Sequence, residues 1–132
     1  NTISAYVYDA EGRRFLEIDG SPFAAGLAPN AMALSPDSAY LFVSNSGADT
    51  ISAYAIDSAD GSLSAVSGSP FPAGDYPTDV TLARNGAYLY ALNQGSGDIS
   101  AYSVNPTTGA LSALDSSGTG TTPLTLKPCS PP

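Results

Sequence analysis

The chain has 132 residues, of which 12 are acidic and 4 are basic, so its formal net charge is −8 at pH 7. A charge of this sign repels nucleic-acid phosphates and anionic membrane surfaces, and we therefore expect no nucleic-acid partner. Hydrophobic residues make up 42% of the chain. No run approaches the roughly 20 apolar residues that span a bilayer, so we also expect no membrane insertion.

A 48-residue repeat organises the whole sequence, as the positions of its copies show. The segment Ile3–Tyr6 recurs as Ile51–Tyr54 and again as Ile99–Tyr102, and "GSPFAAG", which begins at Gly20, recurs as "GSPFPAG" from Gly68. Self-similarity at a fixed period of this length is typical of repeat architectures. The 132 residues therefore hold slightly fewer than three copies of one structural unit.

Each repeat carries four short runs of apolar residues bounded by Gly, Pro, Asn, Asp or Ser, and this pattern predicts four β-strands, which we name a to d. A partial unit at 1–29 supplies strands c and d only. Strands a to d of the next unit are expected at Asn30–Leu34, Tyr40–Ser44, Ile51–Ile56 and Leu63–Val66. The last unit follows at Thr78–Ala83, Tyr88–Leu92, Ile99–Val104 and, with a weaker strand d, Leu111–Leu114.

These strands carry apolar side chains on both faces; in the run from Tyr88 to Leu92, Leu89 and Ala91 point one way and their neighbours the other. Such a sheet needs cover on both faces, and no amphipathic helical segment is present to provide it. We therefore predict an all-β fold of four-stranded antiparallel sheets that pack on copies of themselves, as the blades of a β-propeller do.

The predicted divisions follow the repeat. They are a partial blade at 1–29, a complete blade at 30–77, a second blade with a degraded last strand at 78–117, and an irregular Pro- and Thr-rich tail at 118–132. Propellers have about four to eight blades. Because even four such units would be longer than the chain of 132 residues, the propeller within this chain is incomplete.

The segment from Ser35 to Gly74, "SPDSAYLFVSNSGADTISAYAIDSADGSLSAVSGSPFPAG", resembles the lactonase-type seven-bladed propellers and the related YVTN-repeat proteins. "LFVSN" at Leu41–Asn45 and "LYALN" at Leu89–Asn93 stand where that family has its YVTN-like strand. The resemblance extends from Asn1 to about Leu114 and implies the propeller fold. The family includes one class of 6-phosphogluconolactonase, but many members are surface or secreted proteins without a demonstrated reaction.

The repeated "GSPF" turn predicts how one blade joins the next. We expect Gly20 and Pro22 in the first copy, and Gly68 and Pro70 in the second, to be structural turn residues that close the outermost strand d. The residues that follow would carry the chain inward to strand a of the next blade. The third copy lacks the Pro-Phe pair, so we expect this turn to be lost there.

An incomplete array leaves three outcomes open. The chain is a piece of a longer propeller, or a subunit that completes its first blade with strands of a neighbouring copy to give a ring or a filament, or a marginal open stack. The expected partners are therefore other copies of the chain or the missing blades of a longer chain. A protein or glycan ligand is a further alternative.

Residues for catalysis are few. The sequence has no His, which excludes a His-based catalytic relay or metal site, and no position matches a catalytic motif of the family. The best enzyme candidate is Asp79 with Arg84, an acid at the start of a strand and a cation beyond its end; Asp75 and Tyr76 are further binding candidates. About five residues at roughly 3.3 Å each separate the pair, which favours a turn or channel-mouth role for Asp79 and a solvated turn role for Arg84.

Polar residues recur at the turns between strands b and c, where Asn45 precedes Asp49 and Asn93 precedes Asp98. Asp and Asn oxygens in Gly-rich loops can bind Ca²⁺. Two such side chains per loop are too few for a convincing site, so we interpret them as structural residues that cap the turns by bonding backbone N–H groups. We predict no metal and no cofactor.

The recurring tyrosines are a further candidate for ligand binding. Tyr6, Tyr54 and Tyr102 share one repeat position, and Tyr40 and Tyr88 share another. A ladder of such rings could stack on a carbohydrate, but repeated positions on strands favour a role in packing blade against blade.

Two functions from different classes follow. The first is a non-catalytic propeller module, structural, self-assembling or binding, which is secreted or on the cell surface and presents loops to a protein or glycan. Low Lys content and an acidic charge are compatible with an extracytoplasmic location. The alternative is a fragment of a lactonase-like hydrolase of the 6-phosphogluconolactonase type, with its site in blades that this chain does not contain. The absence of a catalytic motif favours the first.

Overall fold

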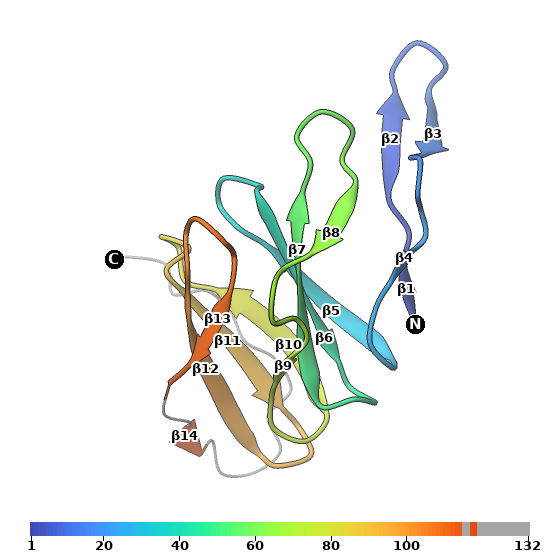
Figure 1. The fold of residues 1–132 in the computed structure, drawn as a ribbon. Coiled ribbons are helices and arrows are strands. Elements are labelled where there is room, and N and C mark those ends of the chain that lie inside the picture. The colour runs from blue at the N-terminus through green and yellow to red at the C-terminus, as the bar shows by residue number, and fades with distance from the viewer. Residues whose placement is uncertain (115–116, 119–132) are drawn as a thin grey trace.

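The computed structural model describes residues 1–114 and 117–118. All of the regular secondary structure in these residues is β-strand (Figure 1). No helix in this part of the chain is long and apolar enough to cross a membrane. The strands form three successive antiparallel units. The predicted all-β fold of antiparallel blades is confirmed. Apart from Gly118, the tail predicted at 118–132 lies outside the described residues.

The central blade is a complete sheet. Its strands are β5 (Pro29–Leu34), β6 (Tyr40–Asn45), β7 (Thr50–Ile56), β8 (Leu63–Ala65) and β9 (Phe71–Pro72). They pair in the order β5-β6-β7-β8, and β9 also pairs with β7. The elements β5 to β8 are strands a to d, and each end lies within one residue of the end predicted from the sequence.

The last blade repeats this sheet. Its strands are β10 (Pro77–Leu82), β11 (Tyr88–Asn93), β12 (Asp98–Val104), β13 (Leu111–Ala113) and β14 (Ser117–Gly118). The pairing order β10-β11-β12-β13, with β14 also on β12, is that of the central blade. The four predicted strands of this unit are confirmed, again within one residue at each end.

The first unit contains strands c and d only, and each is split in two. Its elements are β1 (Thr2–Ile3), β2 (Tyr6–Asp9), β3 (Arg14–Glu17) and β4 (Phe23–Ala24). They form two small sheets, β1-β4 and β2-β3. In the central blade the corresponding strand β7 is continuous and pairs with β6 along its length. The first unit has no such neighbour among the described residues, and this accounts for the interruption.

The "GSPF" turn lies inside the outer strand rather than at its end, which corrects the sequence prediction. β8 pairs with β7 at Tyr54–Ile56 and β9 pairs with the same strand at Thr50–Ile51. Between them, Gly68 has a φ of 89° and Ser69 Oγ accepts a hydrogen bond from the N–H of Ala53 at 2.9 Å. The serine side chain thus replaces the ladder bond that the interrupted outer strand cannot make. The last blade keeps this interruption, as β13 and β14, although it lacks the Pro-Phe pair.

The core lies between blades, as the two apolar faces of each strand predicted. Along β6, Leu41 and Val43 belong to a small cluster shared with the first unit, whereas Phe42 points into a larger cluster shared with the last blade. β10 packs against β5 and β6. The central blade therefore packs against another unit on each face, although the first unit leaves Met32 and Leu34 of β5 exposed.

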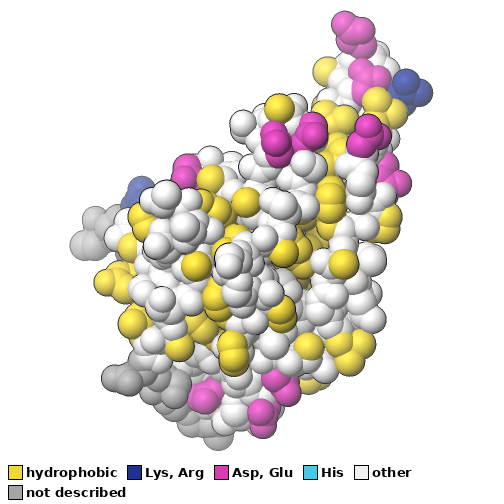
Figure 2. Space-filling model, viewed as in Figure 1, with side chains coloured by type: hydrophobic (Ala, Val, Ile, Leu, Met, Phe, Trp, Pro, Cys, Tyr) yellow, Lys and Arg dark blue, Asp and Glu magenta, His cyan; other side chains and the backbone are white. Residues whose placement is uncertain are grey.

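The ends of the stack leave apolar side chains exposed. Figure 2 shows hydrophobic side chains along the N-terminal hairpin and its border with the next blade, and acidic side chains at both ends of the strands. The large exposed hydrophobics of the first unit and of β5 are Tyr6, Val7, Tyr8, Phe15, Leu16, Leu27, Met32 and Leu34. Met32 and Leu34 occupy the repeat positions of Val80 and Leu82, which pack between blades, so strand a of the first unit would cover them. Tyr6 occupies the position of Tyr54, which packs on the preceding unit.

Candidate functional site

The connectors between blades and the turns between strands b and c meet on one side of the molecule. We call this side the connector face; it consists of residues 25–28, 46–49, 73–76 and 94–97 and lies at the lower edge of Figure 1. The sequence-predicted residues Asp75 and Tyr76 belong to it. Backbone bonds fix both of them, because the carbonyl of Asp75 accepts the N–H of Gly95 at 2.9 Å and the carbonyl of Tyr76 accepts the N–H of Gln94 at 3.0 Å. Tyr76 is 52% exposed.

Asp49 ties the central blade to this connector. Its Oδ1 accepts the N–H of Tyr76 at 2.8 Å, and Tyr76 has a φ of 53°, which is uncommon for a side-chain-bearing residue. The same bond occurs one repeat earlier, where Asn1 Oδ1 accepts the N–H of Ala28 at 2.9 Å and Ala28 has a φ of 52°. Asp49 therefore caps the connector rather than its own turn, which corrects the sequence interpretation.

Asn45 and Asn93 are fully buried below the connector face. The Asn45 amide donates to Thr50 Oγ1 at 3.2 Å and Ser52 Oγ at 2.9 Å, and the Asn93 amide donates to Asp98 Oδ1 at 2.7 Å and Ser100 Oγ at 2.8 Å. These bonds are to side chains, not to the backbone N–H groups that the sequence interpretation proposed. Each amide holds the end of strand b to the start of strand c.

The last glycine of the "GSPFAAG" and "GSPFPAG" motifs lies over these amides. A Cβ on Gly26 would lie 2.5 Å from Cγ of Asn45, and one on Gly74 would lie 2.6 Å from Nδ2 of Asn93. Any larger residue would therefore collide with the buried amide. This role was not predicted from the sequence, although the recurrence of both partners in successive repeats was a signal for it.

The aspartates of the two turns have different roles. Asp98 accepts hydrogen bonds from Asn93 and, at 2.8 Å, from the hydroxyl of Ser96. It occupies the place of Thr50 in the preceding repeat, one residue after the place of Asp49. Among the described residues, no group of three or more His, Cys, Asp or Glu side chains is placed to hold a metal ion.

Asp79 and Arg84 lie at opposite ends of β10. Asp79 follows a β-bulge at the start of the strand, is half-buried, and accepts the N–H of Val80 on Oδ1 at 2.9 Å. Arg84 is exposed in the turn after the strand. The structure places Asp79 beside the connector face and Arg84 on the other side of the molecule, so the two do not form one site.

The repeated tyrosines of strand c join neighbouring blades. Tyr54 donates its hydroxyl to the carbonyl of Ala24 at 2.7 Å, and Tyr102 donates to the carbonyl of Pro72 at 2.5 Å. Both rings are buried. Burial raises the pKa of the Tyr102 phenol above its ordinary value of 10.0, and the charge of Asp98 raises it further against the opposing hydrogen bond with Ser100. These two tyrosines pack blades and are not available to stack on a carbohydrate.

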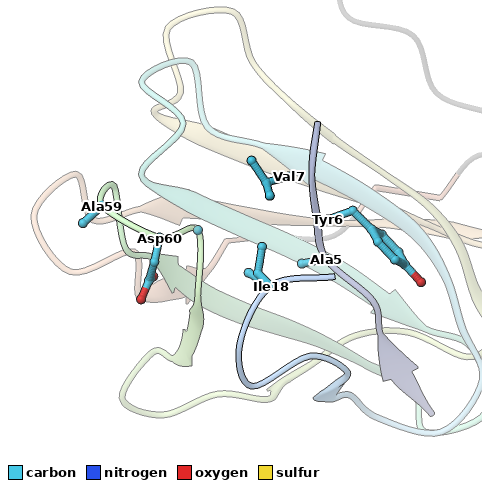
Figure 3. A pocket seen from close by; sticks show the side chains of 7 residues that line it. Ala5, Tyr6, Val7, Ile18, Ala59 and Asp60 are labelled. Carbon is cyan, nitrogen blue, oxygen red and sulfur yellow. The ribbon is translucent and has the colours of Figure 1, made fainter. Parts of the chain in front are cut away.

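Among the grooves on the described surface, three lie where units or their turns meet. The one in Figure 3 has a volume of about 480 Å³ and separates the first unit from the strand c–d turn of the central blade. Its lining residues are Ala5, Tyr6, Val7, Ile18, Ala59, Asp60 and Gly61. The second, about 160 Å³, runs beside Met32 and Ile3. The third, about 150 Å³, lies between the a–b turns of the central and last blades, beside Tyr40 and Asn85.

The comparison with protein families identifies one match. The family model described as "Lactonase, 7-bladed beta-propeller" matches residues 1–128. No curated protein matches the chain.

Solved structures resemble the chain over most of its length. A "putative 6-phosphogluconolactonase" of Bacteroides fragilis superposes with a TM-score of 0.83 at 25% identity, covering 96% of this chain and 35% of that one. A protein of Lactobacillus plantarum superposes with a TM-score of 0.79 at 25% identity, and the match covers 94% of this chain and 37% of that one. The periplasmic gluconolactonase PpgL of Pseudomonas aeruginosa superposes with a TM-score of 0.77 at 20% identity, and the match covers 91% of this chain and 34% of that one. At this identity the likeness shows the fold alone. The chain thus spans 34–37% of the length of these structures.

Proposed function

Because the chain belongs to the seven-bladed lactonase family of β-propellers, we propose that it supplies blades to a ring that hydrolyses the lactone of a sugar acid. The observation that carries the proposal is the family match over 1–128, and the likeness to the Bacteroides fragilis protein adds to it. The substrate class is a gluconolactone, with or without a 6-phosphate. The family match thus favours the lactonase-like alternative over the non-catalytic module that the sequence alone favours.

The part of the chain closest to such a substrate is the edge where blades converge. β10 packs against β5 and β6, so the strands a of successive blades come together at the narrow side of the stack. In a closed ring this side lines the central channel. Asp79 lies there, at the connector-face end of β10, and we assign it to the channel mouth.

Lactone hydrolysis needs a base that takes a proton from water and donors that stabilise the negative charge on the carbonyl oxygen. The sequence has no His, so the base from this chain would be a carboxylate, and Asp79 is the candidate on the channel side. We propose that Asp79 orients and deprotonates the attacking water. The donors to the carbonyl oxygen would come from other blades of the ring.

The test is lactone hydrolysis by the protein as its source produces it, followed in a pH-stat as acid released from gluconolactone with and without a 6-phosphate. Removal of a general base typically lowers rates by about 10²–10⁴-fold. We expect Asp79→Asn to show a loss of this size, while Asp19→Asn, a change at an exposed acid between β3 and β4, keeps the rate. Acid release no faster than the uncatalysed blank would overturn the proposed activity. Equal rates for the two variants would remove Asp79 from it.

A second candidate is the non-catalytic, self-assembling or binding module, which the exposed apolar face at Met32 and Leu34 favours. An open blade face of this kind has to be covered for the array to be stable. Light scattering after size exclusion would measure whether the chain forms a discrete multimer. The extracytoplasmic location belongs to the same proposal, and cell fractionation with an antibody to the chain tests it.

A further inference from the structure

The turn between strands a and b of the last blade contains an Asn-Gly pair. Asn85 is the only one of the six asparagines in the sequence that precedes a glycine. Asparagine is a thermolabile residue, because the backbone nitrogen of the following residue can attack its side-chain carbonyl carbon. A glycine has no Cβ to hinder this attack. The sequence thus sets Asn85 apart from the other asparagines.

The fold leaves this turn accessible to water. Asn85 is exposed, and Gly86 is half-buried with a φ of 72°. The N–H of Ala87 donates to Oδ1 of Asn85 at 3.0 Å, so a donor already stands at the oxygen on which negative charge develops during the attack. The N–H of Gly86 donates to the carbonyl of Ala83 at 2.8 Å, and this bond has to open before the nitrogen can react. Exposed turns open at a low cost in free energy.

Two other exposed asparagines have neighbours that hinder the reaction. Asn105 is followed by Pro106, whose nitrogen has no hydrogen to lose, so the ring closure cannot be completed. Asn30 is followed by Ala31, whose N–H donates to Oγ of Ser44 at 3.2 Å. That bond lies within the pairing of β5 with β6, which opens less readily than a surface turn.

The remaining three asparagines are hindered by burial or by a branched neighbour. Asn45 and Asn93 are fully buried, and their amide nitrogens, which would have to leave, donate to side chains of strand c. Asn1 precedes Thr2, whose branched Cβ crowds the attacking nitrogen. Exposure, an unhindered nitrogen and a polarised carbonyl therefore coincide at Asn85.

We propose that Asn85 is a site of spontaneous deamidation at the junction between the central and last blades. The nitrogen of Gly86 forms a bond to Cγ of Asn85, the bond from Cγ to Nδ2 breaks, and Nδ2 leaves as ammonia together with the proton of the Gly86 amide. Water then opens the resulting succinimide ring at either of its carbonyls. One product has an aspartate at position 85. In the other, an isoaspartyl link carries the main chain through Cβ and Cγ.

The two products differ in how well they fit the turn. Asn85 occupies the repeat position of Asp37, whose Oδ1 accepts the N–H of Ala39 at 3.1 Å just as Oδ1 of Asn85 accepts that of Ala87. An aspartate at position 85 therefore fits the turn. The isoaspartyl link lengthens the main chain by an atom, so the backbone bonds that close the turn cannot keep their geometry.

The turn also forms part of the contact between the two blades. Asn85 and Gly86 line the groove of about 150 Å³ together with Asp37 and Tyr40 of the central blade, and a Cβ on Gly86 would lie 2.9 Å from Cδ of Pro36. A turn displaced by the isoaspartyl link disturbs this contact. Either product also brings a second carboxylate to the groove beside Asp37, so deamidation changes both the charge and the packing of the junction.

The test incubates the folded chain of 132 residues at mildly alkaline pH and follows each asparagine by mass spectrometry of tryptic peptides. Conversion of an amide to an acid raises the mass of the peptide, and fragmentation assigns the gain to one residue. We expect Asn85 to convert at least about 10-fold faster than Asn105, a ratio that corresponds to about 1.4 kcal/mol in the barrier. Equal rates at these two residues, or a gain that appears first at another asparagine, would overturn the proposal.

Two variants connect the modification to the blade junction. Asn85→Gln has a longer side chain that would have to close a larger ring, so it should show no mass gain at position 85. After the same incubation, the wild type should unfold at a lower urea concentration than before, whereas Asn85→Gln should be unchanged. Fresh Asn85→Asp carries the product charge without the isoaspartyl link and should unfold with the fresh wild type. Equal losses in incubated wild type and Asn85→Gln would overturn the effect on the junction, and a lower midpoint for fresh Asn85→Asp would contradict the fit of aspartate to the turn.

Discussion

The hydroxyl of Tyr102 lies 2.5 Å from the carbonyl oxygen of Pro72, which belongs to the outer strand of the preceding blade. Tyr54 makes the same bond to Ala24 at 2.7 Å, one repeat earlier. Each bond joins strand c of one blade to the second half of the interrupted outer strand of its neighbour. The interruption at the "GSPF" turn therefore gives the outer strand a short segment whose carbonyl the next blade binds.

Removing this hydroxyl should destabilise the stack. A typical intramolecular hydrogen bond contributes about 0.5–1.5 kcal/mol, and Tyr102→Phe keeps the ring while leaving the Pro72 carbonyl without this donor. We expect a loss of about 1 kcal/mol in the free energy of unfolding, measured by urea denaturation. Tyr76→Phe, at a residue that is 52% exposed, is the control and should change it little. Equal losses in the two variants would contradict a structural role for the Tyr102 bond.

The same tyrosine should make stability depend on alkaline pH. Burial raises the pKa of Tyr102 above 10.0 in the folded state. The folded protein therefore holds this proton at pH values where the unfolded chain has lost it. Its contribution is complete below the unfolded pKa of about 10 and is lost as the pH rises through the folded pKa. Urea midpoints between pH 8 and about 11.5 should fall more steeply for the wild type than for Tyr102→Phe. Parallel curves would rule out this contribution.

The strands were predictable because the repeat and the apolar pattern agree. Every predicted strand of the two fuller units lies within one residue of its observed ends. The interruption of the outer strand was not predictable from this pattern, because it depends on Ser69 Oγ replacing a ladder bond to Ala53. A hydrophobic pattern carries no information about such a substitution.

The site was less predictable than the fold. Asp49 binds the N–H of Tyr76, which lies 27 residues away in a different segment, so inspecting the turn alone could not find the partner. Asp49 and Asp98 stand in similar turns of the sequence, although the 48-residue step of the repeat aligns Asp98 with Thr50. A strict alignment of the repeats would have separated their roles. The close contact between Gly74 and Asn93 could be recognised only from distances in the folded structure.

The close approach of Gly74 to the buried Asn93 amide predicts that a larger residue at position 74 destabilises the fold. A Cβ at this position would lie 2.6 Å from Nδ2 of Asn93 and 2.7 Å from Oγ of Ser96, and Asn93 is fully buried and cannot move aside. Overpacking in a close-packed interior typically costs about 1–3 kcal/mol. We expect Gly74→Ala to lower the free energy of unfolding by this amount. Gly47→Ala is the control, because the nearest contact of its Cβ would be Cγ of Leu27 at 2.9 Å, in a side chain of a residue that is 55% exposed and can rotate. If the two variants lose the same free energy of unfolding, the close contact between Gly74 and Asn93 is not the cause of the loss.

Leu34 and Leu82 occupy the same repeat position in different surroundings, and this pair tests whether the β5 face of the central blade is open. Leu82 is 8% exposed in the core between blades, whereas Leu34 is 56% exposed. Replacing a buried leucine with alanine typically costs about 2–5 kcal/mol, and most surface changes cost less than about 0.5 kcal/mol. Leu82→Ala should therefore destabilise the chain strongly and Leu34→Ala hardly at all, as measured by urea denaturation. When other blades of the proposed ring cover β5, the cost of Leu34→Ala should rise toward that of Leu82→Ala. A large cost for Leu34→Ala in the monomeric chain would mean that this face is already covered.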